Sequence, residues 1–243
     1  MLRRQDLRET SLILTFYTKG FGKIKGIVRG VRGQRPICSG GSFELFAHDE
    51  VVFYERKRTE FFTISQCDLV EFFNPVRESL TRLSYATYMA ELLDSVTQLS
   101  DKNEDVFALL LNSLKLLSGS ASPRRVARIF EIKLLDYLGI MPTLEQCVGC
   151  ASVPGADARF SLRHGGLICP KCASSDKLAC RLLPGTIKFM EYVRAVPFEK
   201  AANVKVAERV GRELEGLLRR FLDYHIERRL KTLDFIKAME KVV

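Results

Sequence analysis

Hydrophobic and polar residues alternate along the first part of the chain. The alternation is clear in "SLILTFYTK" (11–19) and "KIKGIVRGV" (23–31), and it continues in "FELFAHDEVVFYER" (43–56) and "TEFFTISQCDLVEFF" (59–73). A period of two residues is typical of strands with one buried face. Four to five such strands with no helical pattern among them predict a small closed barrel, which leaves no strand edge exposed. The OB-fold is the barrel of this size that most often binds nucleic acid.

After Pro75 the hydrophobic period lengthens to that of a helix. Helices are predicted in the segments 78–99, 103–119, 122–139, 183–196 and 206–239. The helix at 122–139 has the clearest limits, because Ser122 suits the N-cap, Pro123 the first helical position and Gly139 the end.

A C-x2-C-x18-C-x2-C motif interrupts the helical part of the chain. Its members are Cys147, Cys150, Cys169 and Cys172. Two cysteines three positions apart can turn their sulfurs toward one point, and two such pairs can form a tetrahedral zinc site. Four thiolates leave no position open for water, so we expect one structural zinc ion rather than a catalytic one. The surrounding segment has few large apolar residues and needs such a staple.

These patterns together predict an α+β chain with three parts. The predicted parts are an OB-fold nucleic-acid-binding domain at 1–78, an α-helical domain made of 79–146 and 183–243, and a zinc-binding module at 147–182 inserted in the helical domain.

Composition narrows the class of protein. The chain has 243 residues, of which 47% are hydrophobic and 28% charged, as in ordinary soluble globular proteins. No apolar run is long enough to span a bilayer, and no apolar stretch of a signal peptide follows Arg3 and Arg4. With seven cysteines, an odd number, we expect metal-bound or free thiols and a cytoplasmic location.

The net charge of +9 is concentrated in one acid-free stretch between Glu9 and Glu44. A polyanionic partner such as nucleic acid would relieve the repulsion among its cations, although a solvated basic hairpin has the same composition. The cations of this stretch are Lys19, Lys23, Lys25, Arg29, Arg32 and Arg35. A predicted hairpin tip adds Arg56, Lys57 and Arg58, and the aromatic residues that we expect to stack on bases are Tyr17, Phe21 and Tyr54.

Three arginines begin the helix at 122–139, namely Arg124, Arg125 and Arg128. Cations at a helix N-terminus oppose the helix dipole, which favours an anionic partner, although ordinary surface charge is the alternative.

No catalytic residue is predicted. His225 and Glu227 spell the H-x-E of zinc deaminases, but in those enzymes the cysteine pair follows the histidine, whereas here it precedes it. His164 stands beside Gly165 and is expected in a turn, and no phosphate-binding loop or nucleophile motif is present.

The order of these parts resembles the RecO family of bacterial recombination mediators. "RETSLILTFYTKGFGKIKGIVRGVRG" (8–33) is similar to the opening of that family, with its strand, T-x-x-x-G turn and R-G-V-R ending. "LLDYLGIMPTLEQCVGC" (134–150) is similar to the family's L-x-x-x-G-x-x-P approach to the first cysteine pair, and "GGLICPKC" (165–172) to the second. The resemblance covers nearly the whole chain. Some members lose the cysteines, and this chain keeps all four.

The resemblance implies a function in DNA repair without enzymatic bond making or a small-molecule substrate. Members bind single- and double-stranded DNA, anneal complementary strands, act with RecR, and help load RecA onto strands coated by single-stranded DNA-binding protein. It places DNA contacts on the cations of the acid-free stretch. It also implies a helical-domain contact to the acidic tail of single-stranded DNA-binding protein, which we assign to Arg124, Arg125 and Arg128.

Two other classes stay open from the residues alone. A zinc-ribbon RNA-binding or transcription accessory factor would have the same barrel and cysteines, and a zinc hydrolase or deaminase would use the metal for catalysis.

Overall fold

The computed structural model describes residues 1–7, 9–31, 38–39, 43–55, 59–155, 157–174, 176–226 and 230–240. The chain divides into two compact units. The first is Met1–Pro123 together with Leu230–Val243, and the second is Arg124–Arg229. This division differs from the predicted three parts, because the barrel groups with the first helices and with the end of the chain.

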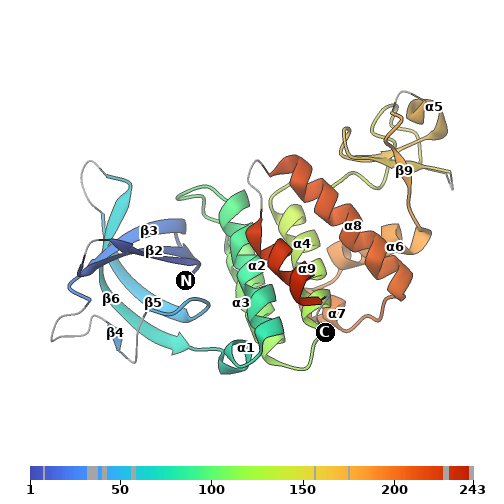
Figure 1. Cartoon of the computed structure of the whole chain (residues 1–243). Helices are drawn as coiled ribbons and strands as arrows, with labels where there is room; N and C mark the ends of the chain where they lie inside the picture. The colour runs from blue at the N-terminus through green and yellow to red at the C-terminus, as the bar shows by residue number, and fades with distance from the viewer. Residues whose placement is uncertain are drawn as a thin grey trace. The chain divides into compact units, whose positions relative to one another are not determined.

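The first unit begins with a six-stranded sheet. Its strands are β1 (Arg3–Leu7), β2 (Ser11–Thr18), β3 (Gly22–Arg29), β4 (Cys38–Ser39), β5 (His48–Tyr54) and β6 (Phe61–Glu71). Strands β1, β2 and β3 form an antiparallel meander, β3 pairs in parallel with β6, and β5 pairs antiparallel with β6 (Figure 1). Backbone hydrogen bonds join the two ends of this sheet, since the Phe46 amide donates to the Met1 carbonyl oxygen over 3.1 Å. The predicted OB-like barrel is confirmed.

Alternation along β2 and β3 builds the barrel core. Leu12, Leu14 and Phe16 of β2 point inward and pack with Ile24 and Val28 of β3. Gly26 lies between the last two, and a Cβ atom there would come within 2.4 Å of the Ile64 side chain. Glycine at this position therefore lets β3 approach β6 closely.

The turn between β2 and β3 also needs glycine. Gly22 has a φ of 64°, and a Cβ atom there would lie 2.0 Å from the carbonyl oxygen of Asp101. The turn is held by the Thr18 hydroxyl, which accepts from the Phe21 amide and donates to the Gly22 carbonyl oxygen. It therefore presents Lys19 and Phe21 in a defined conformation.

Helices complete the first unit. They are α1 (Asn74–Arg77), α2 (Leu80–Val96), α3 (Glu104–Ser118) and α9 (Lys231–Glu240). Ser79 and Asn103 cap the N-termini of α2 and α3 with their side chains. Glu91 of α2 does the same for α9 from a distance, because its carboxylate accepts from the Lys231 and Thr232 amides at 3.0 and 2.9 Å.

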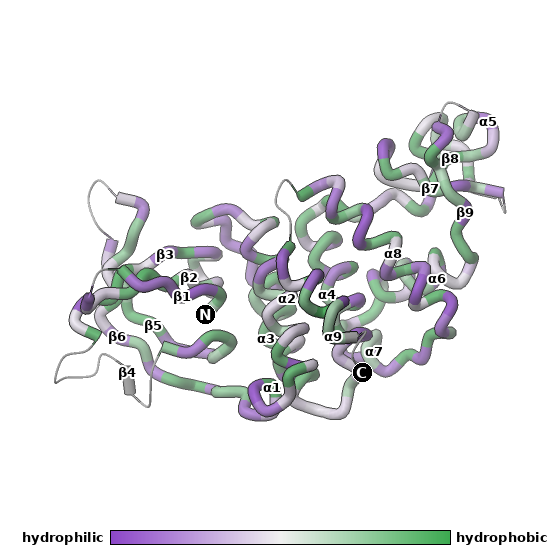
Figure 2. Tube along the Cα trace, in the orientation of Figure 1, coloured by the Kyte–Doolittle hydropathy of each residue, from purple (hydrophilic) through white to green (hydrophobic). Residues whose placement is uncertain are grey.

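The second unit is built from helices with a small sheet among them. Its elements are α4 (Pro123–Tyr137), β7 (Arg159–Ser161), β8 (Gly166–Ile168), α5 (Pro170–Ala173), β9 (Cys180–Arg181), α6 (Pro184–Ala195), α7 (Phe198–Ala202) and α8 (Glu208–His225). The sheet has the order β8-β7-β9 and follows the first cysteine pair. Hydrophobic and hydrophilic residues form separate bands along α8 (Figure 2), and the buried band includes Leu214, Leu218 and Phe221. The helical part of the prediction is thus confirmed.

Two predicted elements differ from the structure. The helix predicted at 206–239 is two helices, because Ile226 takes an extended backbone conformation and ends α8. Leu230 already belongs to the other unit, so the residues after it pack on α2 and do not extend α8. The strand β1 had not been predicted, because its sequence RRQDL is polar and mostly exposed. Among the described residues, no helix is both long and apolar enough to cross a membrane.

Candidate nucleic-acid interface and metal centre

The outer face of β1, β2 and β3 carries exposed cations. Residues paired directly across neighbouring strands point to the same face of a sheet. Arg3 pairs with Thr15, and Thr15 pairs with Lys25, so the two cations lie in one row across the three strands. Arg29 lies on the same face, four residues or about 13 Å further along β3. We call Arg3, Lys25 and Arg29 the basic row face.

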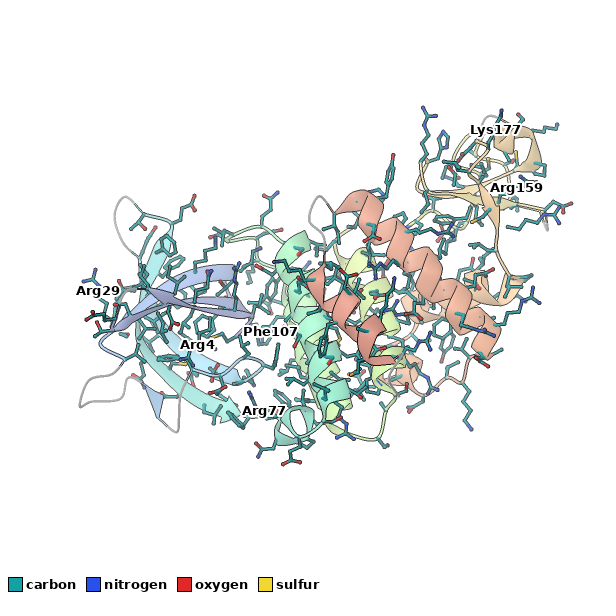
Figure 3. The ribbon with its side chains drawn as sticks, in the orientation of Figure 1. Arg4, Arg29, Arg77, Phe107, Arg159 and Lys177 are labelled. Atoms are coloured by element: carbon teal, nitrogen blue, oxygen red, sulfur yellow. The ribbon has the colours of Figure 1, made fainter. Side chains whose placement is uncertain are left out.

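The members of the basic row face differ in exposure. Arg3 and Arg29 are exposed, and Figure 3 shows Arg29 projecting from the far end of the barrel. Lys25 is half-buried beside a hollow of about 270 Å³, which Glu55 and Glu60 also line. These acids partly balance the charge of Lys25. Lys19, in the β2–β3 turn, is exposed.

Lys23 has a different role from the one predicted. Its side chain is only 9% exposed, and its ammonium donates to the backbone oxygen of Asp94 at 2.6 Å and to the carboxylate of the same residue at 3.2 Å. The Ser100 amide donates to the Lys23 carbonyl oxygen at 2.8 Å. Lys23 thus joins β3 to the end of α2, and its charge is neutralised inside the unit.

Other predicted contact residues are not described by the structure. Arg32, Arg35, Arg56, Lys57 and Arg58 lie outside the described residues.

The predicted stacking residues divide into exposed and buried ones. Phe21 is 57% and Tyr54 62% exposed, as a stacking surface requires. The Phe21 ring is held edge-on to Phe53, with ring centroids 5.1 Å apart. Tyr17 is buried, and burial raises the pKa of its hydroxyl to about 12. Tyr17 therefore offers no open ring face for stacking on the surface.

The four motif cysteines converge on one point in the second unit. The sulfurs of Cys147, Cys150, Cys169 and Cys172 all lie within 4.8 Å of one another. The Cys150 and Cys169 sulfurs are 3.8 Å apart. In a tetrahedron with metal–sulfur bonds of about 2.3 Å, neighbouring sulfurs are also about 3.8 Å apart. The group can therefore hold one tetrahedrally coordinated metal ion.

Backbone geometry prepares this site for a metal. The Cys169 amide donates to the Cys147 sulfur over 3.2 Å, and this hydrogen bond is the main reason that the pKa of the Cys147 thiol is lowered to about 6. A lowered pKa favours the thiolate, which is the form that binds metal. A Cβ atom at Gly149 would lie 2.9 Å from the Cys172 sulfur, so the first cysteine turn requires glycine.

A serine, a histidine and an aspartate meet beside this module. The Ser161 hydroxyl donates to Asp176 at 2.5 Å and contacts Nδ1 of His164 at 2.9 Å. In a hydrolytic triad the histidine lies between the other two, whereas here the serine does. Ser161 is also fully buried and accepts from the His164 amide, so the cluster fixes the turn between β7 and β8.

The arginines at the start of α4 take part in contacts within the second unit. Arg124 pairs with Glu215, which is on α8. Arg125 donates to the Ala202 carbonyl oxygen at 3.4 Å. Arg128 is buried and pairs with Glu131 at 2.7 Å. The structure therefore gives all three arginines internal contacts, and only Arg124 and Arg125 keep exposed surface.

One cation of the interface was missed by sequence reasoning. Arg3 precedes the acid-free stretch and lies on the polar strand that showed no alternating hydrophobic pattern. Only the register of β1 with β2 places it beside Lys25.

Comparison with known proteins identifies the family. Residues 1–73 match the family model "Recombination protein O N terminal", and residues 77–234 match "Recombination protein O C terminal". A DNA repair protein RecO of Pelotomaculum thermopropionicum is 34% identical over 97% of this chain and 91% of its own length. That of Acetivibrio thermocellus is 29% identical over 100% and 96%. The chain therefore belongs to the RecO family of DNA repair and recombination proteins.

Proposed function

We propose that this protein is a DNA-binding recombination mediator of the cytoplasm. It binds single- and double-stranded DNA, anneals complementary strands, acts with a RecR-type partner, and helps load the recombinase onto strands coated by single-stranded DNA-binding protein. No bond-making step is part of this proposal.

The basic row face carries the proposal. Arg3, Lys25 and Arg29 lie on one outer face of an OB-like barrel, and Lys19 extends from the neighbouring turn. OB barrels bind single strands through basic surfaces and exposed aromatic rings. Phe21, in the same turn as Lys19, is an exposed ring that can stack on a base.

We propose zinc as the metal of the four-cysteine site, with a structural role. Thiolate ligands in a tetrahedral arrangement favour zinc, and four of them leave no position for a substrate. The metal would hold the module in shape while DNA binds to the other unit.

For the acidic tail of single-stranded DNA-binding protein, we propose Arg124 and Arg125 alone. Arg128 was also predicted, but its guanidinium is buried against Glu131 and is not accessible to a peptide. An Arg124→Gln, Arg125→Gln variant should bind the tail peptide more weakly in fluorescence anisotropy, and unchanged binding would remove this contact from the proposal.

Charge reversal tests the DNA interface. An Arg3→Glu, Lys25→Glu, Arg29→Glu variant should lose affinity for single-stranded DNA, and its salt slope should fall by about 2, because each phosphate contact on a single strand contributes about 0.7. The matched control reverses three exposed cations of the second unit, Lys205, Arg209 and Arg212, with the same change in net charge. If the two variants lose affinity equally, the effect is one of net charge and the assignment to the barrel is wrong.

Competition between DNA and RNA separates this function from the alternative of an RNA-binding or transcription factor. We expect single-stranded DNA to compete at least as well as RNA of the same sequence, and we expect the protein to accelerate strand annealing. Preference for RNA without annealing would favour the alternative.

A further inference from the structure

A cavity of about 580 Å³ lies in the first unit between one end of the barrel and α3. Binding pockets for small ligands commonly have volumes of about 300–1,000 Å³ and mostly apolar walls. Aromatic rings and leucines dominate the walls here. The barrel contributes Tyr17, Phe21 and Phe53, and α3 contributes Phe107, Leu110 and Leu111. Phe107 lies on the barrel side of α3 (Figure 3), where its ring contacts His48 at a centroid distance of 6.0 Å.

Polar groups stand at a few places around this cavity. Lys19 lines it from the β2–β3 turn, and Asp49 and Glu50 line it from β5. Tyr17 is 7% exposed, and its hydroxyl has no hydrogen-bond partner among the residues that the structure describes. An unsatisfied buried hydroxyl lowers stability unless a ligand completes it.

We propose that the cavity receives one unstacked nucleobase from a single strand of DNA, while the adjoining phosphate lies against Lys19. This inference rests on the proposed DNA-binding function and names the part of the strand that the cavity holds. The base faces contact the aromatic and leucine side chains, and the base edge supplies the partner that the Tyr17 hydroxyl lacks. Phe21, which is half-exposed and lines the cavity, stacks at the entrance.

The chemistry of the walls disfavours other occupants. An aliphatic or phenyl side chain of a peptide would fill the apolar space but leave the Tyr17 hydroxyl without a partner. An acidic peptide or a phosphate inside the cavity would meet the carboxylates of Asp49 and Glu50. A nucleobase is uncharged, has two apolar faces, and carries amino groups that those carboxylates can accept from.

Filling the cavity tests this inference. Leu110→Trp adds bulk inside the cavity, and Leu116→Trp adds the same bulk on the same helix at a residue that does not line it. Two probes are used, an oligodeoxycytidylate of about twelve nucleotides and a fully abasic oligomer of equal length. The wild-type protein should bind the base-bearing oligomer about five- to hundred-fold more tightly than the abasic one.

The Leu110→Trp variant should lose most of that difference while its affinity for the abasic oligomer and its salt slope stay unchanged. The Leu116→Trp variant should behave as the wild type does. A folded Leu110→Trp variant that keeps the base-dependent difference overturns the inference. If the wild-type protein binds neither oligomer, the proposed function itself has failed.

Tyr17→Phe is the second variant, and it decides the question if Leu110→Trp does not fold. It removes only the hydroxyl, so the free protein should be at least as stable as the wild type. Binding of the base-bearing oligomer should weaken several-fold, with no change for the abasic oligomer. Equal weakening for both oligomers, or none for either, contradicts a base in contact with this hydroxyl.

Discussion

The barrel and the four-cysteine module are both small, yet different forces hold them together. In the barrel, eight buried residues form one hydrophobic cluster that includes Leu14, Val28 and Ile64. The corresponding cluster of the module consists of Cys147, Ile168, Ala173 and Ala179. The first is a conventional core, whereas the second has so little apolar volume that its metal ligands are part of it. Stability in the barrel therefore depends on side-chain packing, and in the module on coordination.

This difference separates the work of the two regions. The basic row face is supported by a core that contains none of the four motif cysteines. The metal centre lies in the other compact unit. Loss of metal should therefore damage the module first and leave the barrel folded.

Removal of the metal should have the largest effect. Structural zinc contributes about 10–16 kcal/mol of apparent binding free energy in small zinc domains. After chelation, or in a Cys147→Ser variant, we expect fast hydrogen exchange in peptides from 147–182 and unchanged exchange in β2 and β3. Equal loss of protection in the barrel would show that the two regions are not independent.

A cavity in the barrel core should have the converse effect. Leu14 is fully buried, so Leu14→Ala should lower the free energy of unfolding of the first unit by about 2–5 kcal/mol. Urea unfolding measures the loss, and metal analysis should still find one ion per chain. A Leu14→Ala protein that loses its metal would contradict the separation.

Two neighbouring lysines of β3 should respond differently to the same substitution. Lys23→Gln breaks the partly buried ion pair with Asp94 and should lower stability by about 1–3 kcal/mol with little change in DNA affinity. Lys25→Gln should weaken DNA binding and leave stability nearly unchanged. Thermal melts and binding isotherms of both variants check the assignment, and a reversed pattern would return Lys23 to the DNA interface.

Alkaline pH should give the smallest effect. Burial raises the pKa of Tyr17 to about 12 from the usual 10.0, so the unfolded chain ionises first as the pH rises. Stability from this group is complete below pH 10 and decreases between about pH 10 and 12, by about 2 kcal/mol at most. Urea unfolding at several pH values should show this decrease, and Tyr17→Phe should reduce it. The module should instead weaken toward acid, where protonated thiols release the metal.

The chain's periodicity and motif spacing predicted most of this architecture. Alternation in β2 and β3 and the two C-x2-C pairs have local causes, since strand pleat and ligand turns depend on a few neighbouring residues. The role of Lys23 depends on Asp94, which lies 71 residues away, and no local pattern contains that information. The same holds for Arg3, whose place on the interface depends on strand register. The end of α8 at Ile226 was missed because the helical period continues beyond it.

The return of α9 to the first unit has a consequence for synthesis of the protein. Residues on both sides of Arg124–Arg229 are needed to complete the first unit, since Glu91 of α2 caps α9. Ribosomes add about 5–20 residues per second, so the 120 residues from 124 to 243 require about 6–24 s. During that interval the surface of α2 that receives α9 is open, and the nascent chain exposes it to chaperones. The zinc-bearing unit is translated before α9, so it can fold while the barrel unit still waits for its last helix.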